Sequence, residues 1–365
     1  MVQLRIPGPT PCPPEVLAAM AWPMVDHRGA EYKKMLLDVT GKLKTVYQTQ
    51  NDLLILTGSG TGGLEAAVVN VLSPGEKVLS VSIGVFGDRW ANIAKTFGAD
   101  VVSLNYEWGK AANPDEIARA LIDNPDVTAV MVTHNETSTG VTNDLEAIAR
   151  VVKGAGKLLL VDAISSLSSL NLPVDDWGCD IVVSGSQKGW MVPPGLVFAS
   201  MSEQAWKAFD KAKMPRFYWD LGKAKTFLEK GENPWTPAIS IVYALSVSLD
   251  MMLKEGLQNI FDRHTKLATM TREGVKALGL SLFADEEYAS NTVSAIRSPE
   301  GFDGNELRRI IRDDHNVVLA GGQRTLAGKI FRIGHLGYVS EEDIKEVHAA
   351  IKAGLNRIGF SRGPK

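Results

Sequence analysis

Short apolar runs alternate with longer amphipathic segments between residues 52 and 201. The runs are DLLILTGSG, KVLSVSIG, VTAVMVTH, KLLLVDAIS, DIVVSGS and LVFAS. They are almost continuously apolar, which is typical of parallel strands that are buried on both faces. The segments between most of them have helical spacing, as in LEAAVVNVL and DLEAIARVVKGAG. The pattern therefore predicts an α/β domain with a mainly parallel sheet covered by helices.

The two ends of the chain have a different texture. The segment RIPGPTPCPP is too rich in proline for a helix or a central strand, so residues 1–14 are predicted to form an extended arm. Helical spacing begins at about Glu15, and a long helical stretch from about Ile239 predicts a connecting helix or pair of helices. We therefore expect a large domain over residues 15–255 and a smaller C-terminal α+β domain over 256–365.

Composition limits the possible partners. The 365 residues carry a net charge of −3 with no basic block, so neither nucleic acid nor a membrane surface is expected as a partner. No apolar run is long enough to span a bilayer. The cysteines, Cys12 and Cys179, lack metal-ligand spacing, so no metal site is predicted and both are expected to be buried thiols. Two free thiols and no signal sequence favour the cytoplasm.

A glycine-rich turn joins the first apolar run to a helical segment. Residues 58–63 read GSGTGG, and glycines there let a ligand approach the backbone at a helix N-terminus, which favours a phosphate. No lysine follows as in a P-loop, and the dinucleotide motif GxGxxG fits only in part. A tight turn with no ligand is the alternative interpretation of this loop alone.

Two charged residues follow later strands. Asp162 ends the run LLLVD, where a carboxylate needs a donor or cationic partner, although a capping role is equally compatible. Lys188 follows DIVVSGSQ; an exposed strand-end lysine is the commoner case, whereas burial would yield a neutral nucleophilic amine. A phosphate cradle, a carboxylate and an amine at one sheet edge are together what pyridoxal 5′-phosphate (PLP) requires.

The ordered motifs make the chain resemble a class V aminotransferase of PLP-dependent fold type I, of the alanine–glyoxylate and serine–glyoxylate kind. The resemblance rests on PGPTPCPPEV, GSGTGGLEAAVVNVLSPGEKVL, GVFGDRW, VTHNETSTGV, LLLVDAISSL, DIVVSGSQKGWMVPPG, WTPAIS and FRIGHLG. It implies a large PLP-binding domain, a smaller C-terminal domain, and a homodimer with active sites at the interface.

The resemblance also implies roles for particular residues. Lys188 would hold PLP as an internal aldimine and shuttle a proton, and Asp162 would pair with the pyridine nitrogen. The other residues implied to contact the cofactor are Ser59, Gly60, Thr61 and Gln187 at the phosphate, Phe86 stacked on the ring, and Thr137 near its phenolic oxygen.

Three further residues are implied at the substrate or at the dimer interface. Arg332 would bind the substrate carboxylate, as a guanidinium does in bidentate fashion. Gly8 would border the pocket and keep it open for a small substrate. Thr236 would reach the phosphate of the other subunit; the tyrosine that relatives carry shortly before it is missing from Asn233-Pro234-Trp235.

The resulting hypothesis is ping-pong transfer of an amino group from alanine or serine to glyoxylate or pyruvate. A 2-aminoethylphosphonate transaminase stays open, because Arg28, Arg324 or Lys329 could bind a phosphonate. A cysteine desulfurase is disfavoured, because neither cysteine lies in the C-terminal domain.

Two alternatives belong to other classes of protein. A nicotinamide-dependent dehydrogenase fits poorly, because Glu76, the acidic residue at about the right distance, precedes a strand. A non-catalytic scaffold subunit is disfavoured by the retained lysine, aspartate and arginine. His134 and Glu136 suggest a general base, but Lys188 already supplies one, so His134 is interpreted as packing or loop structure.

Overall fold

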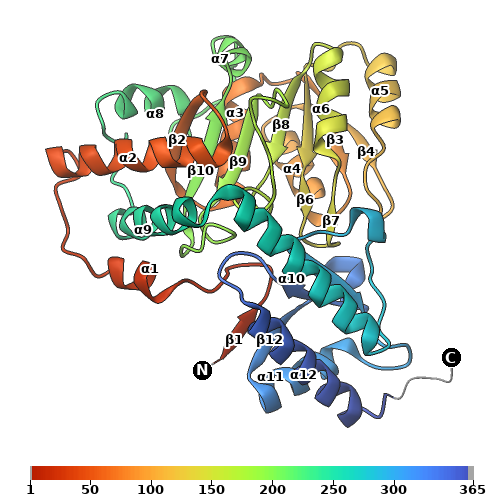
Figure 1. The fold of residues 1–365 in the computed structure, drawn as a ribbon. Helices are drawn as coiled ribbons and strands as arrows, with labels where there is room; N and C mark the ends of the chain where they lie inside the picture. Colours follow the sequence, from red (N-terminus) through yellow and green to blue (C-terminus); the bar gives the residue numbers. More distant parts are fainter. Residues whose placement is uncertain (1, 361–365) are drawn as a thin grey trace.

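The computed structural model describes residues 2–360, which form a large and a small lobe joined by a long diagonal helix (Figure 1). The large lobe is built on a seven-stranded sheet in which β10 runs antiparallel to both neighbours and the other neighbouring pairs are parallel. In spatial order its strands are β2 (Asp52–Gly58), β10 (Gly195–Met201), β9 (Ile181–Gly185), β8 (Leu158–Asp162), β5 (Ala129–Thr133), β3 (Lys77–Ser82) and β4 (Asp100–Asn105).

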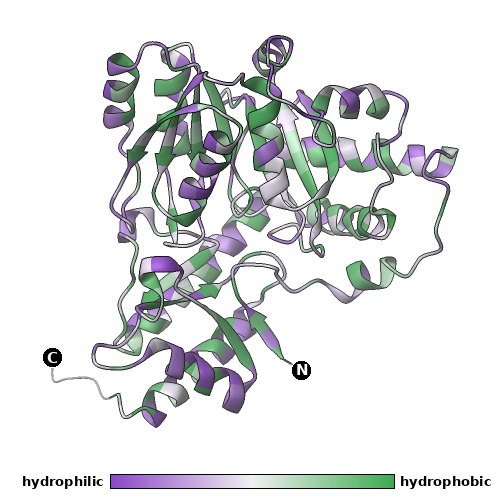
Figure 2. Ribbon diagram, turned by 180° about the vertical axis from the view of Figure 1, so that it is seen from behind, coloured by the Kyte–Doolittle hydropathy of each residue, from purple (hydrophilic) through white to green (hydrophobic). Residues whose placement is uncertain are grey.

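Helices cover both faces of this sheet, which explains the nearly continuous apolar strands. Figure 2 shows the apolar colour concentrated on the strands and the polar colour on the outward sides of the helices. One face carries α3 (Gly60–Val71), α4 (Val85–Thr96), α7 (Glu203–Phe209) and α8 (Leu221–Leu228). The other carries α1 (Pro14–Ala19), α2 (Ala30–Tyr47), α5 (Pro114–Asp123), α6 (Leu145–Gly154) and α9 (Ile239–Glu255). The predicted parallel α/β domain is confirmed.

The long helical stretch is a pair of helices. α9 ends at Glu255, Gly256 takes a φ of +87° that favours glycine, and α10 continues over Leu257–Ala277. α10 then crosses from the large lobe to the small one (Figure 1).

The small lobe is built on a four-stranded sheet in the order β1 (Gln3–Arg5), β12 (Val317–Gly321), β13 (Ile330–Gly334) and β11 (Val293–Arg297). It also contains α11 (Gly304–His315), α12 (Glu341–Arg357) and the short 3-10 helices η1 (Glu286–Tyr288) and η2 (Arg324–Leu326). The N-terminal arm thus supplies an edge strand, β1, which pairs in parallel with β12. Strand β1 ends just before the proline-rich segment. Because β1 is an edge strand, the sheet tolerates prolines next to it.

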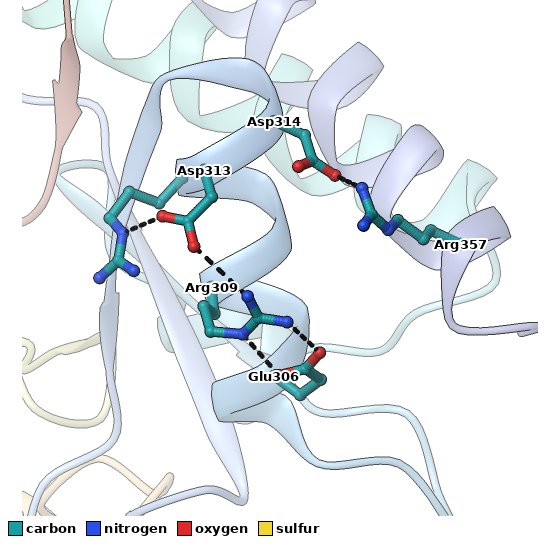
Figure 3. A network of polar contacts seen from close by, with 6 residues as sticks. Glu306, Arg309, Asp313, Asp314 and Arg357 are labelled. Atoms are coloured by element: carbon teal, nitrogen blue, oxygen red, sulfur yellow. Dashed lines mark hydrogen bonds and ion pairs between the residues drawn. The ribbon is translucent and has the colours of Figure 1, made fainter.

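Several ion pairs lie on the surface of the small lobe. On α11, Arg309 bonds Glu306 and Asp313, and Asp314 pairs with Arg357 of α12 (Figure 3). These groups are largely exposed, so water and salt screen the charges and each pair contributes little to stability. Within residues 2–360, no helix combines the length and the apolar character needed to cross a bilayer.

Candidate active site

A cavity of about 340 Å³ opens at the carboxyl ends of β2, β5, β8 and β9, the sheet edge where open α/β folds place ligands. The strands point the same way, so residues from distant parts of the sequence converge there. Its walls are formed by Gly8, Pro9, Ser59, Gly60, Thr61, Leu64, Phe86, Arg89, Asn135, Thr137, Asp162, Ile164, Ser165, Gln187, Lys188 and Pro194. The set includes most of the residues predicted from the sequence and adds several that were not.

Lys188 lies in the loop between β9 and β10, and its side chain is held out of water. The residue is 8% exposed, and its Nζ donates to Pro7 O at 2.6 Å. The pKa of the amine is lowered to about 8, first by burial and then by the charge of Arg332, while Asp162 opposes the shift. The interpretation of Lys188 as an exposed, solvated charge is therefore wrong.

Asp162 is the last residue of β8 and is 3% exposed. Its Oδ1 accepts a hydrogen bond from Ile164 N–H at 3.0 Å, so the turn role expected of a strand-end aspartate is present as well. Burial raises the pKa of the carboxyl to about 7. Among the described residues no cation pairs with it, so a protonated pyridine nitrogen would supply the partner that the buried carboxylate lacks.

The glycine-rich turn forms the N-terminus of α3. Ser59 is the N-cap and makes no side-chain capping bond, and Ser59, Gly60 and Thr61 line the cavity with the positive end of the helix. A Cβ on Gly60 would lie 2.5 Å from Ile164 Cδ1, so close packing requires this glycine. Gln187 lines the same cavity, and its side-chain amide NH₂ is a hydrogen-bond donor. These features fit a bound phosphate.

Sequence reasoning missed the residues that hold Phe86 in place. Glu136 is fully buried and accepts hydrogen bonds from Phe86 N–H at 3.0 Å and Gly87 N–H at 3.2 Å, in the first turn of α4. Ser138 donates to it twice. Burial raises the pKa of Glu136, and these hydrogen bonds oppose the rise. Glu136 thus acts by positioning the α4 turn; it lay in the motif VTHNETSTGV, where a general base was considered.

Arg89 was also missed, although it lies in the quoted motif GVFGDRW. Its guanidinium lies 4.7 Å from the ring centroid of Phe86, and its Nη1 lies 3.4 Å from Thr61 Oγ1. Arg89 therefore places a positive charge beside the α3 N-terminus and at the wall of the cavity.

Arg332, on β13, lies behind Thr137 and does not line the cavity. Its Nη1 donates to Thr137 O at 2.9 Å, and Nε and Nη2 donate to Gly321 O. Thr137 Oγ1 donates to Ser165 Oγ at 2.8 Å, in a buried polar group that includes Asn135. Burial lowers the pKa of Arg332 to about 10, still well above neutrality. Thr137 therefore separates the Arg332 guanidinium from the cavity.

Gly8 lines the cavity, but against Lys188. With a φ of +137°, an added Cβ would lie 2.7 Å from Lys188 Nζ. The missing side chain therefore makes room for the lysine itself, in addition to any room that it leaves for substrate.

The remaining candidates lie elsewhere. Thr236 is exposed and does not line this chain's cavity. His134 is buried edge-on against Trp177. Arg28 pairs with Glu232, and Arg324 pairs with Asp88. Neither arginine, nor Lys329, lines the cavity.

The fold is that of the PLP-dependent transferases of fold type I. The cavity brings a buried amine, a buried carboxylate and a helix N-terminus together at one sheet edge. The chain matches the family "Aminotransferase class-V" over residues 4–347. It therefore belongs to the class V aminotransferases, and this family implies PLP as the cofactor.

Individual relatives carry different names. The chain is 45% identical to the soluble hydrogenase 42 kDa subunit of Anabaena cylindrica, covering 98% of this chain and 94% of that protein. It is 39% identical to the L-aspartate–glyoxylate aminotransferase of Paracoccus denitrificans, covering 92% and 86%. The solved structure of alanine–glyoxylate aminotransferase from Nostoc sp. matches with a TM-score of 0.94 at 31% identity, covering 97% and 95%.

Proposed function

We propose that this aminotransferase uses PLP to move the amino group of a small amino acid, alanine or serine, to glyoxylate or pyruvate in a ping-pong cycle. The observation that carries the proposal is the buried Lys188 amine, in one cavity with the Asp162 carboxylate and the α3 N-terminus. PLP, when bound, supplies an electron sink that weakens the Cα–H bond of an amino acid. A hydrogenase activity is not proposed, because these groups match the needs of PLP.

The chain's own residues divide the work. Lys188, with a pKa lowered to about 8, holds the proton that moves between the substrate Cα and the cofactor. The Asp162 carboxylate keeps the ring nitrogen protonated, and the α3 N-terminus with Gln187 binds the phosphate. Arg332 binds the substrate carboxylate once it exchanges its backbone acceptors, Thr137 O and Gly321 O, for the ligand.

Cavity size supports a small substrate. Ligand pockets range over roughly 300–1,000 Å³. The cavity, about 340 Å³, is near the lower limit, so a cofactor leaves space for a short side chain only. A 2-aminoethylphosphonate substrate is less well supported, because Arg28 and Arg324 are paired away from the cavity.

Aspartate is a second candidate donor. Arg89 offers a cation at the cavity wall, apart from Arg332 behind Thr137, and one relative is named for aspartate and glyoxylate. Glyoxylate is the acceptor named both for that relative and for the Nostoc structure.

We also propose a homodimer in which Thr236 binds the phosphate in the partner's cavity. Thr236 follows Trp235, whose ring stacks on Phe217 at 5.0 Å, and Phe217 is 68% exposed. An aromatic surface of this kind is typical of an interface. Analytical ultracentrifugation should give a dimer, and Thr236→Val should weaken PLP binding without changing the mass. A monomeric active enzyme would refute this part.

Purified protein tests the main proposal. It should absorb visible light with PLP, and borohydride should fix the cofactor on the Lys188 peptide, as mass spectrometry would show. Lys188→Arg should abolish the label, whereas Lys211→Arg, at an exposed lysine outside the cavity, should keep it. Alanine, serine, aspartate and aminoethylphosphonate should then be assayed against glyoxylate and pyruvate. A colourless protein that does not bind added PLP would sink the proposal.

A further inference from the structure

The loop that carries Lys188 rests on the turn that follows β13. Gly337 in this turn is buried with a φ of +77°. A Cβ there would lie 3.3 Å from Lys188 O and from Thr10 Oγ1, and 3.4 Å from Met191 Cγ. Thr10 Oγ1 itself donates to Lys188 O at 2.9 Å. A shift of Gly337 should therefore displace the backbone of Lys188, because a close-packed interior transmits strain.

Both polar groups of Gly337 are bound by neighbouring residues of α10. Gly337 N–H donates to His264 Nε2 at 3.0 Å, and Gly337 O accepts from Arg263 Nη1 at 3.0 Å. Arg263 also donates to the Glu255 carboxylate, through Nε at 2.6 Å and Nη2 at 3.2 Å. This ion pair spans Gly256, where α9 ends and α10 begins. One point of the turn is thus fastened to the end of α9 and the start of α10.

The tautomer of His264 determines which atom donates and which accepts in its hydrogen bond with Gly337. Its Nδ1 lies 2.7 Å from Ile260 O, so Nδ1 carries the hydrogen and Nε2 is the acceptor. Burial, together with the charge of Arg263, lowers the pKa of His264 to about 3. The ring therefore stays neutral at working pH and is a permanent acceptor for Gly337 N–H.

We infer that His264 and Arg263 are positioning residues that set where Lys188 lies relative to Arg332. Arg332 is on β13, which leads into the clamped turn, and Lys188 rests against the turn itself. The inference rests on the proposed function, since it gives the hydrogen bonds of His264 and Arg263 to Gly337, here called the clamp, a role in the proton transfer at Lys188. Of the two contacts, that of His264 matters more, because Gly337 O also accepts from Val339 N–H at 3.1 Å.

The test compares holoenzyme variants of α10. His264→Leu removes the acceptor, His264→Gln restores an acceptor near the Nε2 position, and Val275→Ala loosens the same helix within the small-lobe core, away from Gly337. We expect His264→Leu to lower kcat by roughly 10- to 100-fold with KM changed far less, because a displacement of about 1 Å at the reacting group has this effect. His264→Gln should recover most of kcat, and Val275→Ala should lower Tm alone.

A second measurement is independent of transamination. The rate at which hydroxylamine removes PLP from the holoenzyme reports how Lys188 is held, and it should rise in His264→Leu but not in Val275→Ala. Arg263→Met should show the same changes to a smaller extent, and it carries the test together with Gly337→Ala if His264→Leu does not fold.

The outcomes separate the two proposals. Equal kcat and equal hydroxylamine rates in His264→Leu and Val275→Ala would overturn the clamp while leaving the function standing. A wild-type holoenzyme that transaminates none of the amino acids would overturn the proposed function, while the hydroxylamine rates would still decide the clamp.

Discussion

Substitution of Gly8 by alanine should disable Lys188 while leaving the fold intact. The new Cβ would lie 2.7 Å from Lys188 Cδ and Nζ and 2.8 Å from Cε, at a φ of +137° that L-residues rarely adopt. Carbon contacts are comfortable at about 3.5 Å or more, so the lysine end must move by roughly 1 Å. Because the clashing atoms are the flexible end of a side chain, the lysine yields before the backbone does. The backbone conformation itself adds about 1–3 kcal/mol of strain.

The expected loss is about 100-fold in kcat, the size that a 1 Å misplacement of a reacting group produces. Steady-state kinetics with the best donor and glyoxylate, together with the absorbance of bound PLP, would measure it. Gly41→Ala is the matched control, since a Cβ at this position on α2 meets nothing within 4 Å. It should keep wild-type kinetics and gain up to about 1 kcal/mol in helix stability. Wild-type kcat in Gly8→Ala would refute the role assigned to the close contact.

Other substitutions test the remaining site residues. Arg332→Ala should raise KM for amino and keto acids roughly 10- to 100-fold while the PLP spectrum persists, and unchanged kinetics would refute carboxylate binding. Asp162→Asn should lower kcat by about 100-fold or more, and an unaffected kcat would exclude the pairing with the ring nitrogen. The pKa of Asp162 in the folded apoprotein, about 7, exceeds the ordinary 3.8, so the stability of the apoprotein should fall as pH rises between these values. Melting curves should show a flatter pH dependence in Asp162→Asn; equal slopes would contradict the burial effect. Glu136→Gln turns an acceptor of four donors into a partial donor and should weaken PLP binding through Phe86, measured by absorbance titration.

Six strands of the large sheet could be predicted because burial on both faces gives each of them a nearly continuous apolar run. The edge strand β4, DVVSLN, is mostly exposed or half-buried and lacks such a run, so the sequence did not predict it. The antiparallel direction of β10 leaves no such signal, since LVFAS is as apolar as β2 and β9, the strands with which it pairs. The pairing of β1 with β12 joins residues more than 300 positions apart in the sequence, and no local pattern records it. The proline-rich arm did reveal its extended character, because proline excludes the alternatives.

The site was predictable where a residue's position made it unusual. Lys188 and Asp162 are costly charges at the ends of apolar strands, and their burial confirms the physical reason for selecting them. Glu136 and Arg89 were not assigned, because their roles depend on contacts with α4 and Thr61 that only the folded chain creates. The sequence also could not show that Arg332 bonds two backbone carbonyls behind Thr137.

The N-terminal arm explains how the two lobes share one active site. Its first strand belongs to the small lobe, and the buried Arg5 forms an ion pair there with the half-buried Asp343. Within a few residues the same arm receives the Lys188 amine at Pro7 O and, through Thr10, bonds the Lys188 carbonyl. The side-chain amine and the backbone carbonyl of Lys188 are thus both bonded by the arm, which is anchored in the lobe that carries Arg332. A movement of the small lobe must therefore shift the amine's acceptor and Arg332 together. The arm and the Gly337 turn thus couple the two groups to which the proposed function assigns proton transfer and carboxylate binding.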